Sequence, residues 1–251
     1  MKIDVNVDMG ESFGRYTLGN DEALMPYITS ANVATGFHAG DPVILEQTVV
    51  WAKKYGVAVG AHVGLPDKQG FGRRQMDLSV EEMRTDVLYQ LGALDAFLKI
   101  HGMKMQHVKP HGILYRMVFE YEKYIDAFLD TIKEYNSDLY IMLPRNTPAF
   151  ERGKVKGLKM AAEMLIDLSY DDDGNWVLER RKQARSPQEV AQRALMVARD
   201  KKIATVSGKL IDADADTVCI HGDAPNAVEV VKEIKKVLDE NGVVLGNLMR
   251  K

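Results

Sequence analysis

The sequence predicts an α/β protein, a parallel (β/α) barrel whose functional site lies at the carboxyl ends of the strands. Strand patterns alternate with helix patterns along the chain, polar residues gather where strands end, and four of the six histidines lie at such ends. Strand ends of a parallel barrel converge on one face, where binding and catalytic groups collect. A length of 251 residues suits one domain, residues 1–251, with a large core.

Composition excludes several classes of protein. The net charge is −3 and no basic block stands out, so we expect no nucleic-acid or anionic membrane partner. Cys219 is the one cysteine, which rules out a disulfide within the chain and favours a reducing compartment, the cytoplasm. No apolar run reaches the roughly 18 residues of a membrane span, and the first residues enter a strand pattern, so we expect neither a membrane span nor a signal peptide.

The first strand is predicted at Ile3 to Asp8, where apolar residues alternate with Asp4, Asn6 and Asp8. In a parallel barrel the apolar face would meet the helices and the polar face would point into the mouth. Glu11 follows in the next loop. The first strand and the loop after it are therefore expected to contribute acid and amide groups to the site.

The segment Ala31 to Pro42 predicts a strand end, a tight turn and a helix start. Two glycines flank His38 and let backbone approach a ligand closely. Asp41 and Pro42 suit the N-cap and the first position of a helix. An ordinary loop with a structural histidine is the alternative for this segment alone.

The other patterns follow in order. Strands are predicted at 57–62, 106–110, 139–143, 158–162 and 217–221, with a short strand at 243–245, and helices at 42–55, 79–101, 121–135, 186–199 and 225–240. Ser79 with Glu82 forms a capping box, and Ser186 with Pro187 and Glu189 marks another helix start. Residues 164–185 predict a loop or a small hairpin.

Polar residues recur at six of the junctions between strand and helix. They are Asp8 and Glu11, His38 and Asp41, His62, Lys109 and His111, Glu163, and His221 and Asp223. The histidines outside this pattern, His101 and His107, are interpreted as surface or packing residues.

Acids, imidazoles and a lysine suit general acid–base chemistry near neutral pH. Asp8, His38 and His62 come from the first three strands and could also hold a divalent metal. The chain has no HExxH, CxxC or GxSxG motif, so zincin, thiol-redox and serine-hydrolase functions have no support. Cys219 lies in an apolar run and is expected to be a core residue.

Seven stretches carry a resemblance to a known family. They are DVNVDMGES (4–12), ANVATGFHAGDP (31–42), GAHVGLPD (60–67), GFGRR (70–74), YQLGAL (89–94), KPHGILY (109–115) and CIHGDAPNAV (219–228). Together, and in this order, they resemble the LamB/YcsF family, the A subunits of bacterial 5-oxoprolinase.

This resemblance implies an irregular α/β barrel of the glycoside hydrolase/deacetylase type. It also implies ATP-dependent opening of the lactam ring of 5-oxo-L-proline to L-glutamate, with ATP as cofactor and with partner B and C subunits. Polysaccharide deacetylases, similar at the level of the fold, use Asp-His-His metal sites. The alternative functions are therefore a metal-dependent deacetylase or amidohydrolase and a non-catalytic binding subunit.

The expected catalytic residues are Asp8, Lys109 and His111. Lys109 would hold an oxyanion or a phosphoryl oxygen, and His111 would carry the proton that the ring nitrogen needs. The alternative is that Lys109 pairs with Asp8 or Glu163 to hold the barrel mouth together. The expected substrate-binding residues are Asn6, Glu11, His38, His62, Arg73, Glu163, His221 and Asp223.

The chain departs from the family pattern in four places. Thr35 replaces a cysteine, Val63 replaces a proline, and a Gly-Ala pair is absent around 183–186. Leu168 stands where the family segment Glu-x-x-x-Asp-Arg has its arginine. Arginine is the natural bidentate partner of a carboxylate or phosphate, so another cyclic amide is an alternative substrate.

Overall fold

The computed structural model describes residues 1–177 and 184–249. Its main sheet is parallel, with the strand order β11-β6-β5-β4-β3-β2-β1-β12. The strands are β1 (Lys2–Met9), β2 (Ser30–Ala34), β3 (Ala58–Val63), β4 (Met105–Pro110), β5 (Tyr140–Leu143), β6 (Lys159–Leu165), β11 (Thr217–His221) and β12 (Val244–Leu245). A second edge of β1 pairs with β11, which closes the sheet into a barrel, while β12 pairs only with the first residues of β1. The predicted irregular barrel is confirmed.

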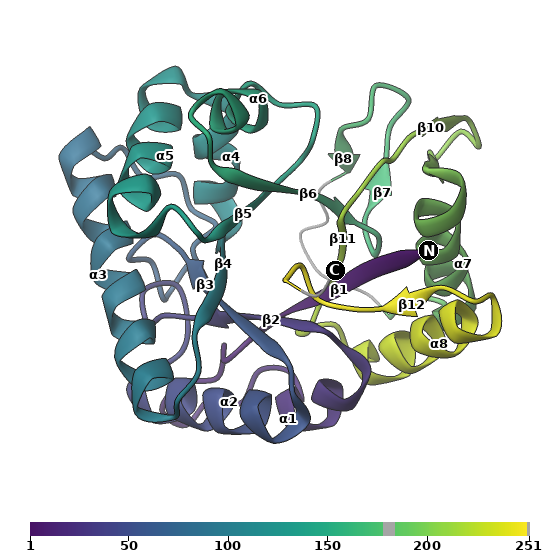
Figure 1. Cartoon of the computed structure of the whole chain (residues 1–251), viewed down its shortest axis with the longest axis horizontal. Helices are drawn as coiled ribbons and strands as arrows, with labels where there is room; N and C mark the ends of the chain where they lie inside the picture. The colour runs from purple at the N-terminus through teal and green to yellow at the C-terminus, as the bar shows by residue number, and fades with distance from the viewer. Residues whose placement is uncertain (178–183, 250–251) are drawn as a thin grey trace.

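Helices cover the outside of the barrel (Figure 1). In the described residues they are α1 (Asp21–Leu24), the short 3₁₀ helix η1 (Met25–Tyr27), α2 (Pro42–Tyr55), α3 (Val80–Ile100), α4 (Gly112–Glu120), α5 (Glu122–Asn136), α6 (Pro148–Val155), α7 (Pro187–Asp200) and α8 (Ala227–Glu240). Figure 1 shows α2, α3 and α5 around one side and α7 with α8 on the other.

Several boundaries and elements differ from the prediction. Helix α8 begins at Ala227, later than the predicted 225, and its N-cap Asn226 makes no side-chain capping bond. Strand β6 continues to Leu165, so Glu163 lies inside the strand rather than after it. Helices α4 and α6 and the antiparallel pair β9 (Lys202–Ala204) and β10 (Leu210–Asp212) were not predicted. The hairpin expected within 164–185 is present as β7 (Ser169–Tyr170) and β8 (Trp176–Val177), whereas residues 178–183 lie outside the described part.

The two faces of β1 explain how the site is positioned. Ile3, Val5 and Val7 belong to the hydrophobic core of the protein. Asp4 and Asp8, with Asn6 between them, are equally buried but hydrogen-bond to partners on neighbouring strands of the barrel. Strands of a parallel sheet are buried on both faces, and here one buried face is polar. The polar side chains therefore lie inside the barrel and reach deeper than its mouth.

A glycine makes room for one interior ring. A Cβ atom added to Gly60 of β3 would lie 2.2 Å from the ring of His107 of β4. His107 is fully buried, which confirms its interpretation as a packing residue. His101 is partly exposed and lies 3.0 Å from Glu46.

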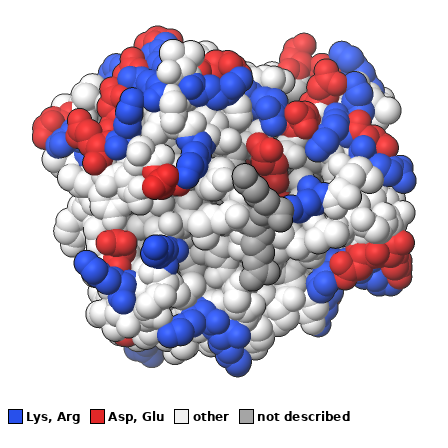
Figure 2. All heavy atoms as spheres, in the orientation of Figure 1, with Lys and Arg blue, Asp and Glu red and all other residues white. Residues whose placement is uncertain are grey.

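Basic and acidic side chains are both spread around the face seen in Figure 2, and neither sign dominates it. Among the described residues, no helix combines the length and the apolar character that crossing a membrane requires.

Candidate active site

The polar residues predicted at the strand ends lie together at one end of the barrel. The Cα register pairs Asp8 of β1 with His221 of β11, and His62 of β3 with Lys109 of β4. Glu163 of β6 reaches the same group, because its Oε1 lies 3.1 Å from Lys109 Nζ. Neighbouring parallel strands thus bring residues far apart in the sequence to one place.

Lys109 is the cation of this buried group. Its Nζ donates to Asp8 Oδ1 at 2.9 Å, and Cys219 Sγ lies at 2.9 Å. Burial alone would raise the pKa of Asp8, but His62 and Lys109 hold it well below its ordinary value. Burial alone would lower the pKa of Lys109, yet Asp8 and Glu163 help to raise it well above its ordinary value. The pair is therefore charged, as an ion pair with little solvent.

Cys219 lies in the barrel interior, as expected of a core residue. Burial raises the pKa of its thiol well above the ordinary value. The protonated thiol is a poor nucleophile, so Cys219 packs against Lys109 rather than reacting.

Three histidines and Glu11 form a second cluster beside Asp8. The ring of His38 stacks on that of His111 with centroids 3.7 Å apart, and His38 Nε2 lies 3.3 Å from Glu11 Oε1. His62 Nε2 lies 2.9 Å from His111 Nδ1 and 3.4 Å from Asp8 Oδ2. The cluster is thus continuous with the ion pair.

Backbone carbonyls fix two protons of this cluster. His62 Nδ1 faces the carbonyl of Lys109 at 3.1 Å, and His111 Nε2 faces the carbonyl of Phe71 at 2.8 Å. A carbonyl oxygen only accepts, so both ring nitrogens carry hydrogen. Burial, and then the charges of His38 and His62, hold the pKa of His111 well below its ordinary value. A neutral His111 therefore directs the lone pair of its Nδ1 toward His62 Nε2. The position between these two nitrogens requires either a third proton or a cation.

These donor atoms fit a metal ion. One donor atom each from Glu11, His38, His62 and His111 lies within 4.8 Å of the others. The expected set was Asp8, His38 and His62; Asp8 lies beside this cluster, with Oδ2 3.4 Å from His62 Nε2 and Oδ1 accepting from Lys109 and Asn32. A metal site here stays a prediction. Imidazole and carboxylate ligands suit borderline transition metals such as zinc.

Three further predicted residues lie at the rim. Arg73 and Asp223 approach to 3.6 Å, and the Arg73 side chain is 44% exposed. His221 Nδ1 lies 2.9 Å from Asp167 Oδ2, and its backbone N–H donates to the same carboxylate. These residues border the buried cluster rather than joining it.

A cavity of about 290 Å³ opens onto the cluster. Its polar wall includes Asp8, His62, Arg73, Lys109, His111 and His221, and its apolar wall includes Ile113, Leu165, Leu168 and Trp176. Leu168, which stands in the sequence where the resembled family has an arginine, therefore borders the cavity.

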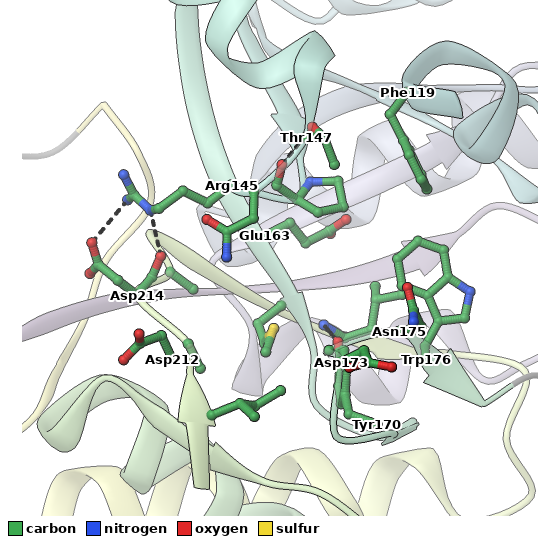
Figure 3. A pocket seen from close by; sticks show the side chains of 18 of the residues that line it. Phe119, Arg145, Thr147, Glu163, Tyr170, Asp173, Asn175, Trp176, Asp212 and Asp214 are labelled. Carbon is green, nitrogen blue, oxygen red and sulfur yellow. Dashed lines mark hydrogen bonds and ion pairs between the residues drawn. The ribbon is translucent and has the colours of Figure 1, made fainter. Parts of the chain in front are cut away.

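A larger cavity of about 540 Å³ lies next to the first and shares Tyr115, Arg116, Leu165 and Trp176 with it. Figure 3 shows Trp176 and Phe119 on one side of this cavity, and Arg145 bonded to Asp214 on the other. The Tyr115 hydroxyl donates to Glu163 Oε2 at 2.8 Å. Tyr115 and Glu163 therefore lie between the larger cavity and Lys109.

Sequence reasoning missed several residues of the site. Asn32 Nδ2 donates to Asp8 Oδ1 at 2.8 Å, Tyr115 holds Glu163, and Asp167 holds His221. Asn32 alternates with Ser30 in a strand of small residues, and that period-two pattern was a usable signal. Tyr115 and Asp167 lie within stretches that carry the family resemblance, KPHGILY and the Glu-x-x-x-Asp segment, but no periodic pattern marked them as site residues.

Comparison with known proteins gives consistent matches along the chain. The LamB/YcsF family model matches residues 3–251. The chain is 47% identical over 246 residues to a Thermococcus onnurineus protein that is named as the A subunit of 5-oxoprolinase, covering 97% of this chain and 96% of that one. A Staphylococcus epidermidis protein of the same name is 43% identical over 250 residues, 99% of each chain. The crystal structure of a lactam utilization protein from Thermus thermophilus has a TM-score of 0.92 and 39% identity, over 98% of this chain and 99% of that chain.

Proposed function

Because the chain belongs to the LamB/YcsF family, we propose that it is the A subunit of a 5-oxoprolinase. In this proposal it opens the lactam ring of 5-oxo-L-proline to L-glutamate, with ATP and with B and C partner subunits, in the cytoplasm. The names of its relatives support the subunit role. The observation that carries the catalytic role is the presence of the buried Asp8–Lys109 ion pair and His111 on the wall of a 290 Å³ cavity, with Glu163 3.1 Å from Lys109.

The proposed reaction adds water to the lactam carbonyl carbon and breaks the bond from that carbon to the ring nitrogen. An unstrained five-membered lactam resists this step, and transfer of the ATP γ-phosphate to its oxygen would release ADP and activate the carbonyl carbon. Water would add to that carbon, and the C–N bond would break as the nitrogen takes up a proton, leaving an acyl phosphate. A second water would then release phosphate and leave glutamate. The site must supply a cation for the phosphoryl oxygens and a proton donor for the departing nitrogen.

The residues have suitable chemistry for these roles. Lys109 Nζ would face the oxyanion or a phosphoryl oxygen, held in place by Asp8 and Glu163. His111 with His62 would deliver the proton to nitrogen, because the two rings share one proton position. Arg73 at the rim would bind the substrate carboxylate, and Leu168 with Trp176 would cover the apolar face of the ring.

The test is to incubate the purified chain, alone and with its partner subunits, with 5-oxo-L-proline and ATP. Glutamate and ADP formed together in the complete mixture would support the proposal. Turnover of other small lactams instead would assign a different cyclic amide. Binding without turnover in every combination would assign a non-catalytic binding subunit.

A second candidate function is metal-dependent hydrolysis of an amide or acetyl group. The lone pair of His111 aimed at His62 within the Glu11, His38, His62 and His111 cluster favours it. A divalent ion held there would act as a Lewis acid on the scissile carbonyl.

Elemental analysis of protein purified without chelator tests the metal. One equivalent of a transition metal, lost in a His38→Ala/His62→Ala variant, is the expected result if the cluster is a metal site. Full activity in a metal-free preparation would exclude this function.

A further inference from the structure

The barrel interior below the site holds a continuous set of buried polar side chains. It comprises Asp4, Asn6, Ser30, Asn32, Gln106, His107 and Thr217, each no more than 1% exposed. Buried polar groups usually find partners, and these side chains bond to one another, with Gln106 Oε1 the one atom of the set that has no hydrogen-bond partner. The direction of each bond, donor to acceptor, is set by its neighbours.

Asp4 lies at the far end of this set from the active site. Its Oδ1 accepts from the hydroxyls of Thr29 and Ser30 at 2.6 and 2.7 Å, and its Oδ2 accepts from Thr217 at 2.6 Å. Burial raises the pKa of Asp4, and the three hydroxyl donors oppose that rise. Both oxygens of Asp4 accept in these bonds, so each hydroxyl donates its hydrogen to Asp4 and is left to accept from its other neighbour.

One branch runs from Asp4 through Thr217 to the site. Thr217 Oγ1 accepts from Asn6 Nδ2 at 2.7 Å. The amide of Asn6 therefore turns its Oδ1 toward the site, where it accepts from Asn32 Nδ2 at 2.7 Å. Lys109 Nζ also faces this oxygen, at 3.5 Å.

The second branch runs through Ser30 and reaches the same asparagine. Ser30 Oγ accepts from Gln106 Nε2 at 2.9 Å, and the same nitrogen faces His107 Nδ1 at 3.1 Å. Burial lowers the pKa of His107 to about 3, so its ring has one hydrogen, on Nε2. That hydrogen is donated to Asn32 Oδ1 at 2.7 Å.

Both branches fix the orientation of Asn32. Its Oδ1 is occupied by His107, so its two amide hydrogens go to Asn6 Oδ1 and to Asp8 Oδ1. Asp8 thus meets donors from Asn32 and Lys109 on the same oxygen. A reversed Asn6 would turn its nitrogen toward Lys109 Nζ and Asn32 Nδ2, which are both donors.

We propose that Asp4 is a positioning residue, which fixes the direction of the hydrogen bonds through the barrel interior and thereby orients Asp8 and Lys109. The effect on turnover rests on the proposed function, whereas the bond directions do not. Asp4 touches neither the cavity nor the site, and it acts through Thr217, Ser30 and the two asparagines.

The test variant is Asp4→Asn, which keeps the shape of the side chain but introduces an amide donor. The amide leaves the hydroxyl hydrogen of Thr217 or of Ser30 without its acceptor and disturbs that branch. We therefore expect kcat to fall about 10- to 100-fold with KM within about twofold, as for a misoriented catalytic group. Thr217→Val and Ser30→Ala each interrupt one branch and should lower kcat in the same way. They also keep the test usable where Asp4→Asn does not fold.

Thr29→Val is the matched control. The Thr29 hydroxyl also donates to Asp4, but among the described residues its other bonds are to the backbone of Val5 alone. The Thr29→Val variant should have a lower unfolding free energy than the wild type but the same kcat per folded molecule. Equal kcat in Asp4→Asn and Thr29→Val would overturn the proposal.

A measurement that does not depend on catalytic turnover separates this proposal from the proposed function. Nitrogen-15 NMR of the histidine rings should find His107 neutral, with hydrogen on Nε2, in the wild-type protein. It should find altered His107 shifts in Ser30→Ala but not in Thr29→Val. Hydrogen on Nδ1 in the wild type, or identical spectra in all three proteins, would contradict the proposal whatever the activity proves to be.

Discussion

Lys109 shows how closely structural and catalytic roles overlap at the scale of one residue. Its side chain is 4% exposed, between Asp8 at 2.9 Å and Glu163 at 3.1 Å. Pairing with Asp8 or Glu163 was the predicted alternative to a catalytic role for Lys109. The structure shows this pairing at a buried position on the cavity wall, so loss of stability in a variant does not by itself distinguish the two roles.

The Lys109→Met variant should lose about 3–5 kcal/mol of unfolding free energy at pH 7, because two carboxylates are left buried without their cation. In the wild type the lowered pKa of Asp8 stabilises the fold above its unfolded-state value of about 3.9. That contribution is lost only as pH falls through the lower folded-state pKa. In the variant the pKa of Asp8 rises, because burial raises it and the lysine that lowered it is gone, so protonation relieves the penalty at a higher pH.

The difference in unfolding free energy between wild type and Lys109→Met should therefore shrink as pH falls from 7 toward about 4.5. Denaturant unfolding of both proteins at the two pH values measures it. A difference that stays constant with pH would mean that the two carboxylates are not charged partners of Lys109.

Individual site residues were predictable where they lie at the end of a predicted strand. Asp8, His62, Lys109 and His111 followed from polar residues after apolar strand patterns, and the structure brings all of them together. Asp167 was not singled out, because it follows the strand among residues without a clear periodic pattern, and only the fold shows that it pairs with His221. Catalytic and substrate-binding roles for these residues stay predictions.

At the scale of elements, helix starts were predicted well because caps are local. The Asp41 side chain accepts from Val43 and Ile44, and the Ser79–Glu82 capping box is formed. Strand ends were less accurate, because pairing with neighbours decides them. Strand β6 runs past the predicted end at 162, since its residues 163–165 pair with β11.

Strand β3 supplies a test of the polar interior. In Gly60→Ala the new Cβ would lie 2.2 Å from the His107 ring, which is fully buried. We expect a loss of about 1–3 kcal/mol of unfolding free energy from overpacking. Denaturant unfolding at neutral pH measures this loss.

Gly92→Ala in α3 is the control for this substitution. A Cβ at Gly92 meets nothing within 4 Å, so replacing this helical glycine by alanine should raise the unfolding free energy by up to about 1 kcal/mol. Equal stability of the two variants would show that His107 does not fill the space beside Gly60.

At the scale of the whole molecule, the sequence predicted the fold class but not how the barrel closes. Closure depends on β11 pairing with β1, from Asp4 with Thr217 to Asp8 with His221. No local sequence pattern indicates which strands, so far apart in the chain, pair with each other. A single domain over residues 1–251 stays a prediction.

The central claim is that this barrel opens a lactam ring with the cluster around Lys109 and His111. The most direct measurement is glutamate formed from 5-oxo-L-proline and ATP, per folded molecule, by His111→Ala in the presence of the partner subunits. The matched control is His101→Ala, which removes a partly exposed histidine paired with Glu46 outside the site. We expect His111→Ala to lose turnover by about 100-fold or more while His101→Ala keeps the wild-type rate. Turnover by His111→Ala at the rate of His101→Ala would contradict the account.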